Sequence, residues 1–143
     1  MTTDCSSTGA RNGALTVYYD ASCPVCVSEM NAVKSRDKRD ALKLIDCSGK
    51  LGTPAGELLD REAMMALLHV RNARGEWLVG IPAYEAILAA IGFPRLARLV
   101  GSKRLRPVLD RLYAFVARNR YRIPARGFAR LLASRAARNA RAP

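Results

Sequence analysis

The feature that most constrains this chain is a pair of cysteines that directly follows a short apolar segment. The stretch "LTVYYDASCPVCVSEM" covers residues 15–30 and places Cys23 and Cys26 two residues apart. The β-branched and aromatic residues before Asp20 predict a short buried strand. Pro24 predicts the first turn of a helix, where its missing N–H removes no hydrogen bond. The cysteines are therefore expected at a strand-to-helix junction, which fits a redox pair, half of a zinc site or ordinary packing.

Two further segments extend this junction into a parallel unit. Cys26, Met30 and Val33 have the spacing of one helix face, and this helix is expected to end in the charged run "KSRDKRD". Residues 41–46 alternate apolar and charged side chains and predict a second strand. A strand, a helix and a strand joined by short loops form a right-handed βαβ unit with parallel strands.

The middle of the chain predicts a hairpin and a second packed helix. After a loop and a short helix capped by Asp60, residues 66–72 and 76–80 predict two strands joined by a turn at Gly75. A helix over residues 82–91 follows, opened by a proline and closed by a glycine. The order β-α-β and then β-β-α, with a small mixed sheet, is that of an α/β thioredoxin-like core. That core places its redox pair at the end of the first strand.

The chain divides into three parts by composition. Residues 1–13 are small and polar and are expected to form a mobile tail, whereas residues 14–92 form the thioredoxin-like core. Residues 93–143 predict a basic helical extension packed on or beside that core, with helices over 107–119 and 127–142. The broad apolar face expected on the first of these helices consists of Val108, Leu109, Leu112, Tyr113, Phe115 and Val116.

The positive charge is concentrated in the last third of the chain. Residues 1–94 carry ten Lys and Arg against eleven Asp and Glu, whereas residues 95–143 carry fourteen against a single acid. A basic helical face is most often simply solvated, but it also suits an acidic protein or an anionic membrane surface. Nucleic acid is disfavoured because few aromatic residues accompany the arginines and no reading motif is present. The stretch "ARNRYR" over residues 117–122 is the best candidate for a specific anion contact.

Length and composition predict an ordinary globular domain. The 143 residues, 50% hydrophobic and 25% charged, suffice for one apolar core. No apolar run approaches the roughly 20 residues of a membrane-spanning helix, and the first residues lack the apolar segment of a secretory signal. A cytoplasmic location is therefore expected, where four cysteines do not usually form a structural disulfide framework.

Cys23 and Cys26 are the candidate catalytic residues. Disulfide exchange requires a thiolate, and the N-terminal end of a helix favours an anion. Cys23 is expected to be partly exposed and to attack, whereas Cys26, about one turn further and more buried, resolves the mixed disulfide. The residues between them carry no charge, so helix position rather than a side-chain cation is expected to stabilise the thiolate. Asp20 either accepts N–H bonds in the turn or accepts the proton of Cys26.

The motif "YYDASCPVC" resembles the signature of the DCC family of thiol–disulfide oxidoreductases, named for its Asp-x-x-Cys-x-x-Cys. Asp20, Cys23 and Cys26 occupy the three signature positions. The stretches "HVRNARGEWLVGIPAYEAI" and "YAFVARNRYRI" also resemble that family, so the likeness covers residues 14–124. It implies a thioredoxin-like fold and a redox role but no particular substrate. The expected partner of such a redox pair is a protein or small-molecule disulfide or dithiol. Unlike most thioredoxins, the chain has no proline in "DREAMMALLHV", before the third strand, and Ser22 replaces the usual tryptophan.

Two other functions use the same parts of the chain. A Cys₃His zinc set would consist of Cys23, Cys26, Cys47 and His69. Cys47 has no second ligand near it in the sequence, so no metal and no cofactor is expected. Cys47 is instead expected to fill space near a strand end, with a third redox thiol as the less favoured role, and Cys5 is expected to be inert. The remaining alternative is a non-catalytic binding module whose Arg-rich C-terminal helices dock an acidic partner or an anionic surface.

Overall fold

The computed structural model describes residues 14–48 and 61–124. Its elements are β1 (Leu15–Tyr19), α1 (Pro24–Lys34), β2 (Leu42–Asp46), α2 (Arg61–Ala66), β3 (His69–Arg71), β4 (Trp77–Val79), α3 (Ile81–Ala90), α4 (Pro94–Val100) and α5 (Arg106–Asn119). The predicted tail over 1–13, Cys5, the cap at Asp60 and the last predicted helix lie outside the described residues. The other predicted elements are present in the predicted order.

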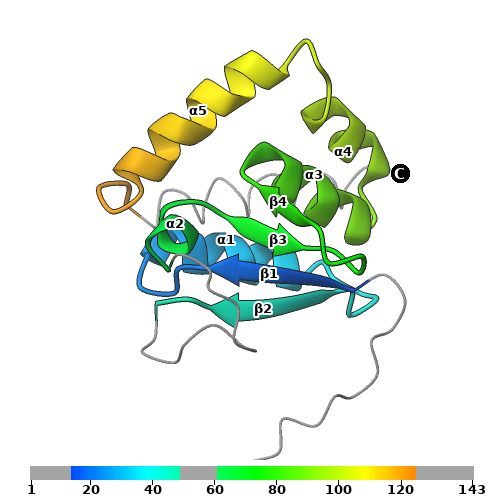
Figure 1. Ribbon diagram of the computed structural model, residues 1–143, viewed down its shortest axis with the longest axis horizontal. Helices are drawn as coiled ribbons and strands as arrows, with labels where there is room; N and C mark the ends of the chain where they lie inside the picture. Colours follow the sequence, from blue (N-terminus) through cyan, green and yellow to red (C-terminus); the bar gives the residue numbers. More distant parts are fainter. Residues whose placement is uncertain (1–13, 49–60, 125–143) are drawn as a thin grey trace, which may run out of the picture.

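The four strands form one mixed sheet in the order β2-β1-β3-β4. β1 and β2 are parallel, with Leu15 opposite Leu42, and β1 and β3 are antiparallel, with Val17 opposite Val70. β3 and β4 form the antiparallel hairpin, whose turn uses Gly75 at a φ of 82°, a conformation that favours glycine. The mixed α/β architecture of a thioredoxin-like fold is therefore confirmed (Figure 1).

The third strand is shorter than the sequence predicted. Residues 66–72 were expected to be extended, but Ala66 ends α2 and the strand begins at His69. Leu68 donates its backbone N–H to the hydroxyl of Tyr113 at 2.8 Å, so a side chain of α5 replaces a partner strand at that position. The segment between α2 and β3 is thus held by the C-terminal part of the chain.

The core lies between the sheet and the helices packed on it. Val17 and Val70 from the two central strands have no exposed surface, and Met30 of α1 and Ile87 of α3 are 1% exposed. These residues belong to one contiguous apolar cluster, in which burial of each large side chain contributes about 1.5–3 kcal/mol. The cluster fixes α1 against the sheet and so fixes the start of α1 at the end of β1.

α5 crosses above the sheet and brings its C-terminal end to the edge where β1 ends and α2 lies (Figure 1). One face of α5 packs inward, and the ring of Tyr113 meets the ring of Tyr84 in α3 at a centroid distance of 5.7 Å. The outer face does not pack, because Val108, Leu112 and Phe115 are 62%, 57% and 60% exposed. The broad apolar face predicted for this helix is therefore not buried at these three residues.

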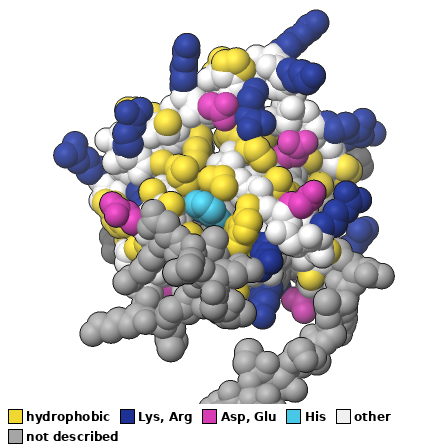
Figure 2. Space-filling view, viewed as in Figure 1, with side chains coloured by type: hydrophobic (Ala, Val, Ile, Leu, Met, Phe, Trp, Pro, Cys, Tyr) yellow, Lys and Arg dark blue, Asp and Glu magenta, His cyan; other side chains and the backbone are white. Residues whose placement is uncertain are grey.

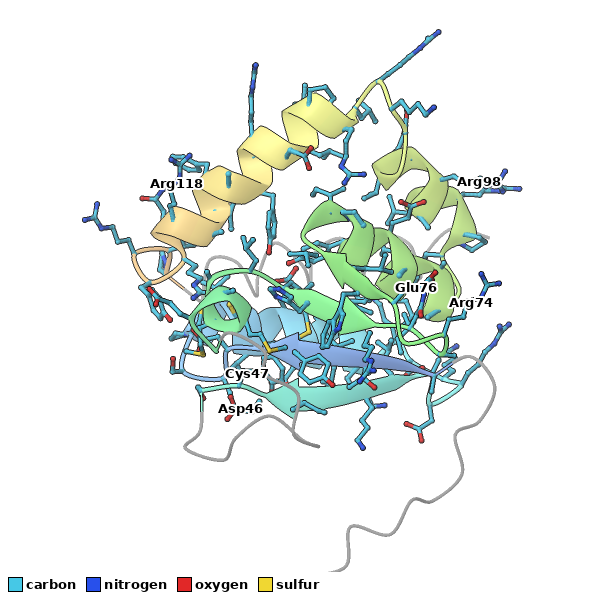
Figure 3. The ribbon with its side chains drawn as sticks, viewed as in Figure 1. Asp46, Cys47, Arg74, Glu76, Arg98 and Arg118 are labelled. Atoms are coloured by element: carbon cyan, nitrogen blue, oxygen red, sulfur yellow. The ribbon has the colours of Figure 1, made fainter. Side chains whose placement is uncertain are left out.

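Basic side chains are spread over the molecular surface. Figure 2 shows Lys and Arg side chains projecting around the rim of the viewed side of the molecule, with hydrophobic side chains gathered toward its centre. Arg118 extends on the outer side of α5 (Figure 3) and donates a hydrogen bond to the carbonyl of Ala114 in its own helix. None of the described helices combines the length and the hydrophobicity that crossing a bilayer requires.

Candidate active site

Cys23 and Cys26 are brought together by the first turn of α1. Cys23 is the N-cap residue, with extended backbone, and its sulfur accepts the backbone N–H of Cys26 at 3.4 Å. The Cys26 thiol donates to the same sulfur across 2.8 Å, and both cysteines are free. Two donors therefore converge on the sulfur of Cys23 at the positive end of a helix.

The relative burial of the two cysteines reverses the prediction. Cys23 has no exposed surface, whereas Cys26 is only partly buried. The sequence predicts Cys23 in a turn and partly exposed. In the fold, the turn before α1 closes back on β1, with the N–H of Cys23 bonded to the carbonyl of Asp20 at 3.3 Å, and residues that follow α5 lie against this turn.

Asp20 is a buried carboxylate with every oxygen engaged. Its exposed fraction is 2%. One oxygen accepts the backbone N–H of Ser22 at 2.9 Å and also the Ser22 hydroxyl, so the predicted role in the turn is confirmed. The other oxygen accepts the hydroxyl of Tyr121 and pairs with the guanidinium of Arg120 at 3.2 Å. The hydrogen bond to Asp20 raises the pKa of Tyr121.

Arg120 is a residue of the candidate site that the sequence did not single out. Its guanidinium pairs with Asp20, lies 3.9 Å from the sulfur of Cys26, and donates to the carbonyl of Met65. The expectation that no side-chain cation assists the cysteines is therefore wrong. The stretch "ARNRYR" was singled out for an anion contact, and the anion that it contacts is the carboxylate of Asp20 in the same chain.

A second carboxyl group lies one turn beyond Cys26. Glu29 is three residues further along α1, and its carboxyl group is enclosed by protein although the residue as a whole keeps some exposed surface. Burial raises the pKa of Glu29 to about 7, and a hydrogen bond shared with the Tyr84 hydroxyl partly opposes that shift. Burial, followed by the neighbouring Glu29 charge, raises the pKa of Tyr84 as well.

A small cavity connects these groups. Its volume is about 50 Å³, enough for a water molecule. Burial raises the pKa of Cys26 well above its usual value, and the shared hydrogen bond with Cys23 acts in the same direction. The polar residues that line the cavity are Tyr19, Asp20, Cys26, Glu29, Tyr84, Tyr113 and Arg120.

The other candidate residues lie outside this cavity. Cys47 follows β2, and its backbone N–H bonds to the carbonyl of Tyr19 at 2.9 Å, so it lies at the same end of the sheet as the cysteine pair (Figure 3). His69 begins β3 and pairs with Tyr18. Over residues 14–48 and 61–124, no three His, Cys, Asp or Glu side chains form a group that could hold a metal ion.

Comparison with known proteins gives two matches and one negative result. A family model described as DCC1-like thiol-disulfide oxidoreductase matches residues 17–126. An uncharacterized chloroplastic protein of Arabidopsis thaliana is 23% identical over 118 residues, which cover 81% of this chain and 55% of that protein. The chain therefore spans about half the length of this curated relative. No solved structure matches the chain.

Proposed function

This chain belongs to the DCC1-like thiol-disulfide oxidoreductase family, and from that membership we propose that Cys23 and Cys26 are its redox pair. The observation that carries the proposal is the convergence of two donors, the N–H and the thiol of Cys26, on the sulfur of Cys23 at the start of α1. The substrate is a protein or small-molecule disulfide in one direction and a dithiol in the other.

In the reducing direction the two cysteines act in sequence. The Cys23 thiolate attacks one sulfur of the substrate disulfide, and the second substrate sulfur leaves as a thiolate that takes up a proton. Cys26 then loses its proton and attacks the sulfur of Cys23, which releases the first substrate sulfur. The substrate gains two electrons, and the Cys23–Cys26 disulfide holds the oxidising equivalent until a dithiol reverses both steps.

The burial of Cys23 adds a condition to this mechanism. Because Cys23 has no exposed surface, a substrate disulfide reaches its sulfur only when neighbouring residues move. Arg120 and Tyr121 lie on the same turn after α5 and are tied to Asp20. We propose that release of this turn opens access to Cys23, whereas the partly exposed Cys26 needs no such movement.

Trapping experiments test the assignment. In a glutathione redox series with alkylation of free thiols, Cys23 and Cys26 should form a reversible mutual disulfide, and Cys47→Ser should leave that disulfide unchanged. Cys23→Ser should abolish exchange, whereas Cys26→Ser should accumulate a mixed disulfide on Cys23. The absence of a mutual disulfide would refute the proposal, and accumulation in Cys23→Ser instead would reverse the two roles.

The outer face of α5 supports a second function, binding to an anionic membrane surface. Val108, Leu112 and Phe115 form one exposed apolar stripe at spacings of four and three residues, and Arg111 and Arg118 are exposed beside it. A convex apolar ridge flanked by arginines suits the headgroup region of an anionic bilayer, whereas a protein partner would have to supply a groove.

Vesicle sedimentation tests this second function. The full chain should bind vesicles that contain phosphatidylserine and should dissociate from them at high salt. It should not bind vesicles of pure phosphatidylcholine. Leu112→Glu should remove the binding without affecting disulfide exchange. Failure to bind phosphatidylserine vesicles would reject this function, and salt-sensitive binding to polyglutamate in that case would identify an acidic protein as the partner class.

A further inference from the structure

Resolution of the mixed disulfide poses a proton problem that the cysteine pair does not solve alone. Cys26 can attack only as a thiolate, yet its thiol is partly buried and donates to the sulfur of Cys23. Burial raises the pKa of Cys26, so few molecules carry the thiolate at neutral pH. The step therefore needs a base within reach of Cys26, either directly or through one water.

Asp20 is poorly suited to be that base. Its oxygens already accept from the Ser22 N–H, the Ser22 hydroxyl and the Tyr121 hydroxyl, and Arg120 pairs with it. Both oxygens are occupied, so a proton from Cys26 would have to displace one of these donors. Asp20 instead anchors the turn after α5.

Glu29 has the opposite environment. It lies three residues after Cys26 in α1, so the two side chains share one helix face, and both line the cavity beside the pair. The other titratable groups that line this cavity are Tyr19 of β1, Asp20, Cys26 of α1, Tyr84 of α3, Tyr113 of α5 and Arg120 after α5. Tyr84 supplies its hydrogen bond, and the salt bridges described for Arg120 lead to Asp20 rather than to Glu29.

We propose that Glu29 is the proton acceptor for Cys26, acting across the cavity that both residues line. This proposal rests on the redox role of Cys23 and Cys26. The thiol proton of Cys26 moves to the Glu29 carboxylate, directly or through a water in the cavity. The electron pair left on the sulfur forms the bond to Cys23 as the bond from Cys23 to the substrate breaks. In the oxidising direction the same proton returns to Cys26.

A carboxyl group that titrates near neutral pH is suited to this exchange. Burial raises the pKa of Glu29 to about 7, so both of its protonation states are populated under ordinary conditions. A base with a pKa near the working pH combines availability with driving force and contributes about 100-fold or more to a proton-transfer step.

A single-turnover experiment separates resolution from attack. The reduced full chain, in a Cys5→Ser/Cys47→Ser background, is mixed with dithiobis(nitrobenzoate), which releases one coloured thiolate when Cys23 attacks and a second when Cys26 resolves. Glu29→Gln should slow the second release at least about tenfold near neutral pH and leave the first within about twofold. The wild-type second phase should accelerate as pH rises through about 7, and this inflection should be absent in Glu29→Gln.

Two further variants keep the test decisive. Glu29→Asp retains a carboxyl group and should retain an inflection. Tyr84→Phe removes the hydrogen bond that lowers the pKa of Glu29 and should move the inflection to higher pH even if Glu29→Gln folds poorly. A wild-type chain with no second release would overturn the redox pair itself. Two normal releases with an unchanged pH profile in Glu29→Gln would overturn only the role of Glu29.

Discussion

Two carboxyl groups line the cavity beside the cysteine pair, and the fold surrounds them differently. Asp20 is 2% exposed and meets a guanidinium, two hydroxyls and a backbone N–H. Glu29 has the Tyr84 hydroxyl as its hydrogen-bond partner, and burial raises its pKa to about 7. Two carboxyl groups beside one cavity therefore need not have the same role.

The difference lies in what compensates the loss of hydration. A buried carboxylate that keeps a cation and several donors remains ionised and acts as a fixed anchor. A buried carboxyl with one neutral donor exchanges its proton at ordinary pH, which suits proton transfer. Arg120 accounts for the difference between the two carboxyl groups, because its guanidinium pairs with Asp20.

Loss of that cation should have the largest effect on stability. Arg120→Met leaves Asp20 buried without its ion pair and should lower the free energy of unfolding by about 3 kcal/mol, as is typical when one partner of a buried pair is removed. Urea unfolding at neutral pH measures this change. Asp20→Asn in the same chain should restore part of the loss, because the uncompensated charge is then gone.

Arg118→Met is the matched control for this substitution. Arg118 lies two residues earlier, is exposed, and among the described residues hydrogen-bonds within its own helix, so its replacement should change the free energy of unfolding by less than about 0.5 kcal/mol. Equal effects of the two substitutions would mean that Arg120 stabilises only the helix end, and the contrast between the two carboxyl groups would lose its explanation.

The buried carboxyl group of Glu29 should make the free energy of unfolding depend on pH. A raised pKa means that the folded state holds the proton more tightly than the unfolded chain, so this stabilisation is complete below the ordinary pKa of Glu and is lost as pH rises through about 7. Wild type should lose up to about 3 kcal/mol from this group between about pH 5 and pH 8, and Glu29→Gln should not. Denaturant titrations at several pH values measure the difference, and parallel curves for the two proteins would contradict it.

A smaller effect than that of Arg120→Met is expected from one hydrogen bond to Asp20. Tyr121→Phe removes the hydroxyl that donates to Asp20 and should lower the free energy of unfolding by about 1–1.5 kcal/mol. Because Tyr121 belongs to the turn proposed to control access, alkylation of Cys23 should also become faster. A slower alkylation would indicate that this tyrosine does not restrict access to the pair.

Much of the fold follows from local sequence patterns. The apolar run before Asp20, the proline at the start of α1, the hairpin turn at Gly75 and the helix after Gly80 all appear where their patterns predicted them. These elements are short-range: each depends on propensities and apolar spacing within about ten residues. The predicted start of β3 is too early. The backbone N–H of Leu68, just before the strand, donates to the hydroxyl of Tyr113, which lies 45 residues away in the sequence.

The site was only half predictable for the same reason. Asp20, Cys23 and Cys26 stand together in the sequence, and their motif points to redox chemistry. The sequence points to Glu29 only weakly, through the position of an acidic residue on the helix face of Cys26. Arg120 is separated from Cys26 by 94 residues, and its basic stretch indicated an anion contact without indicating which anion.

The sequence by itself determined the strand-to-helix junction, the parallel unit around it and the placement of two thiols within one helical turn. Tertiary packing decided which thiol is buried, which carboxyl group is paired and which is free to exchange a proton. The physical reason is that spacing along a helix fixes neighbours within one turn, whereas burial and charge compensation depend on what another segment brings to the same place. Here that segment is the end of α5, which carries Arg120 and Tyr121 to the end of β1.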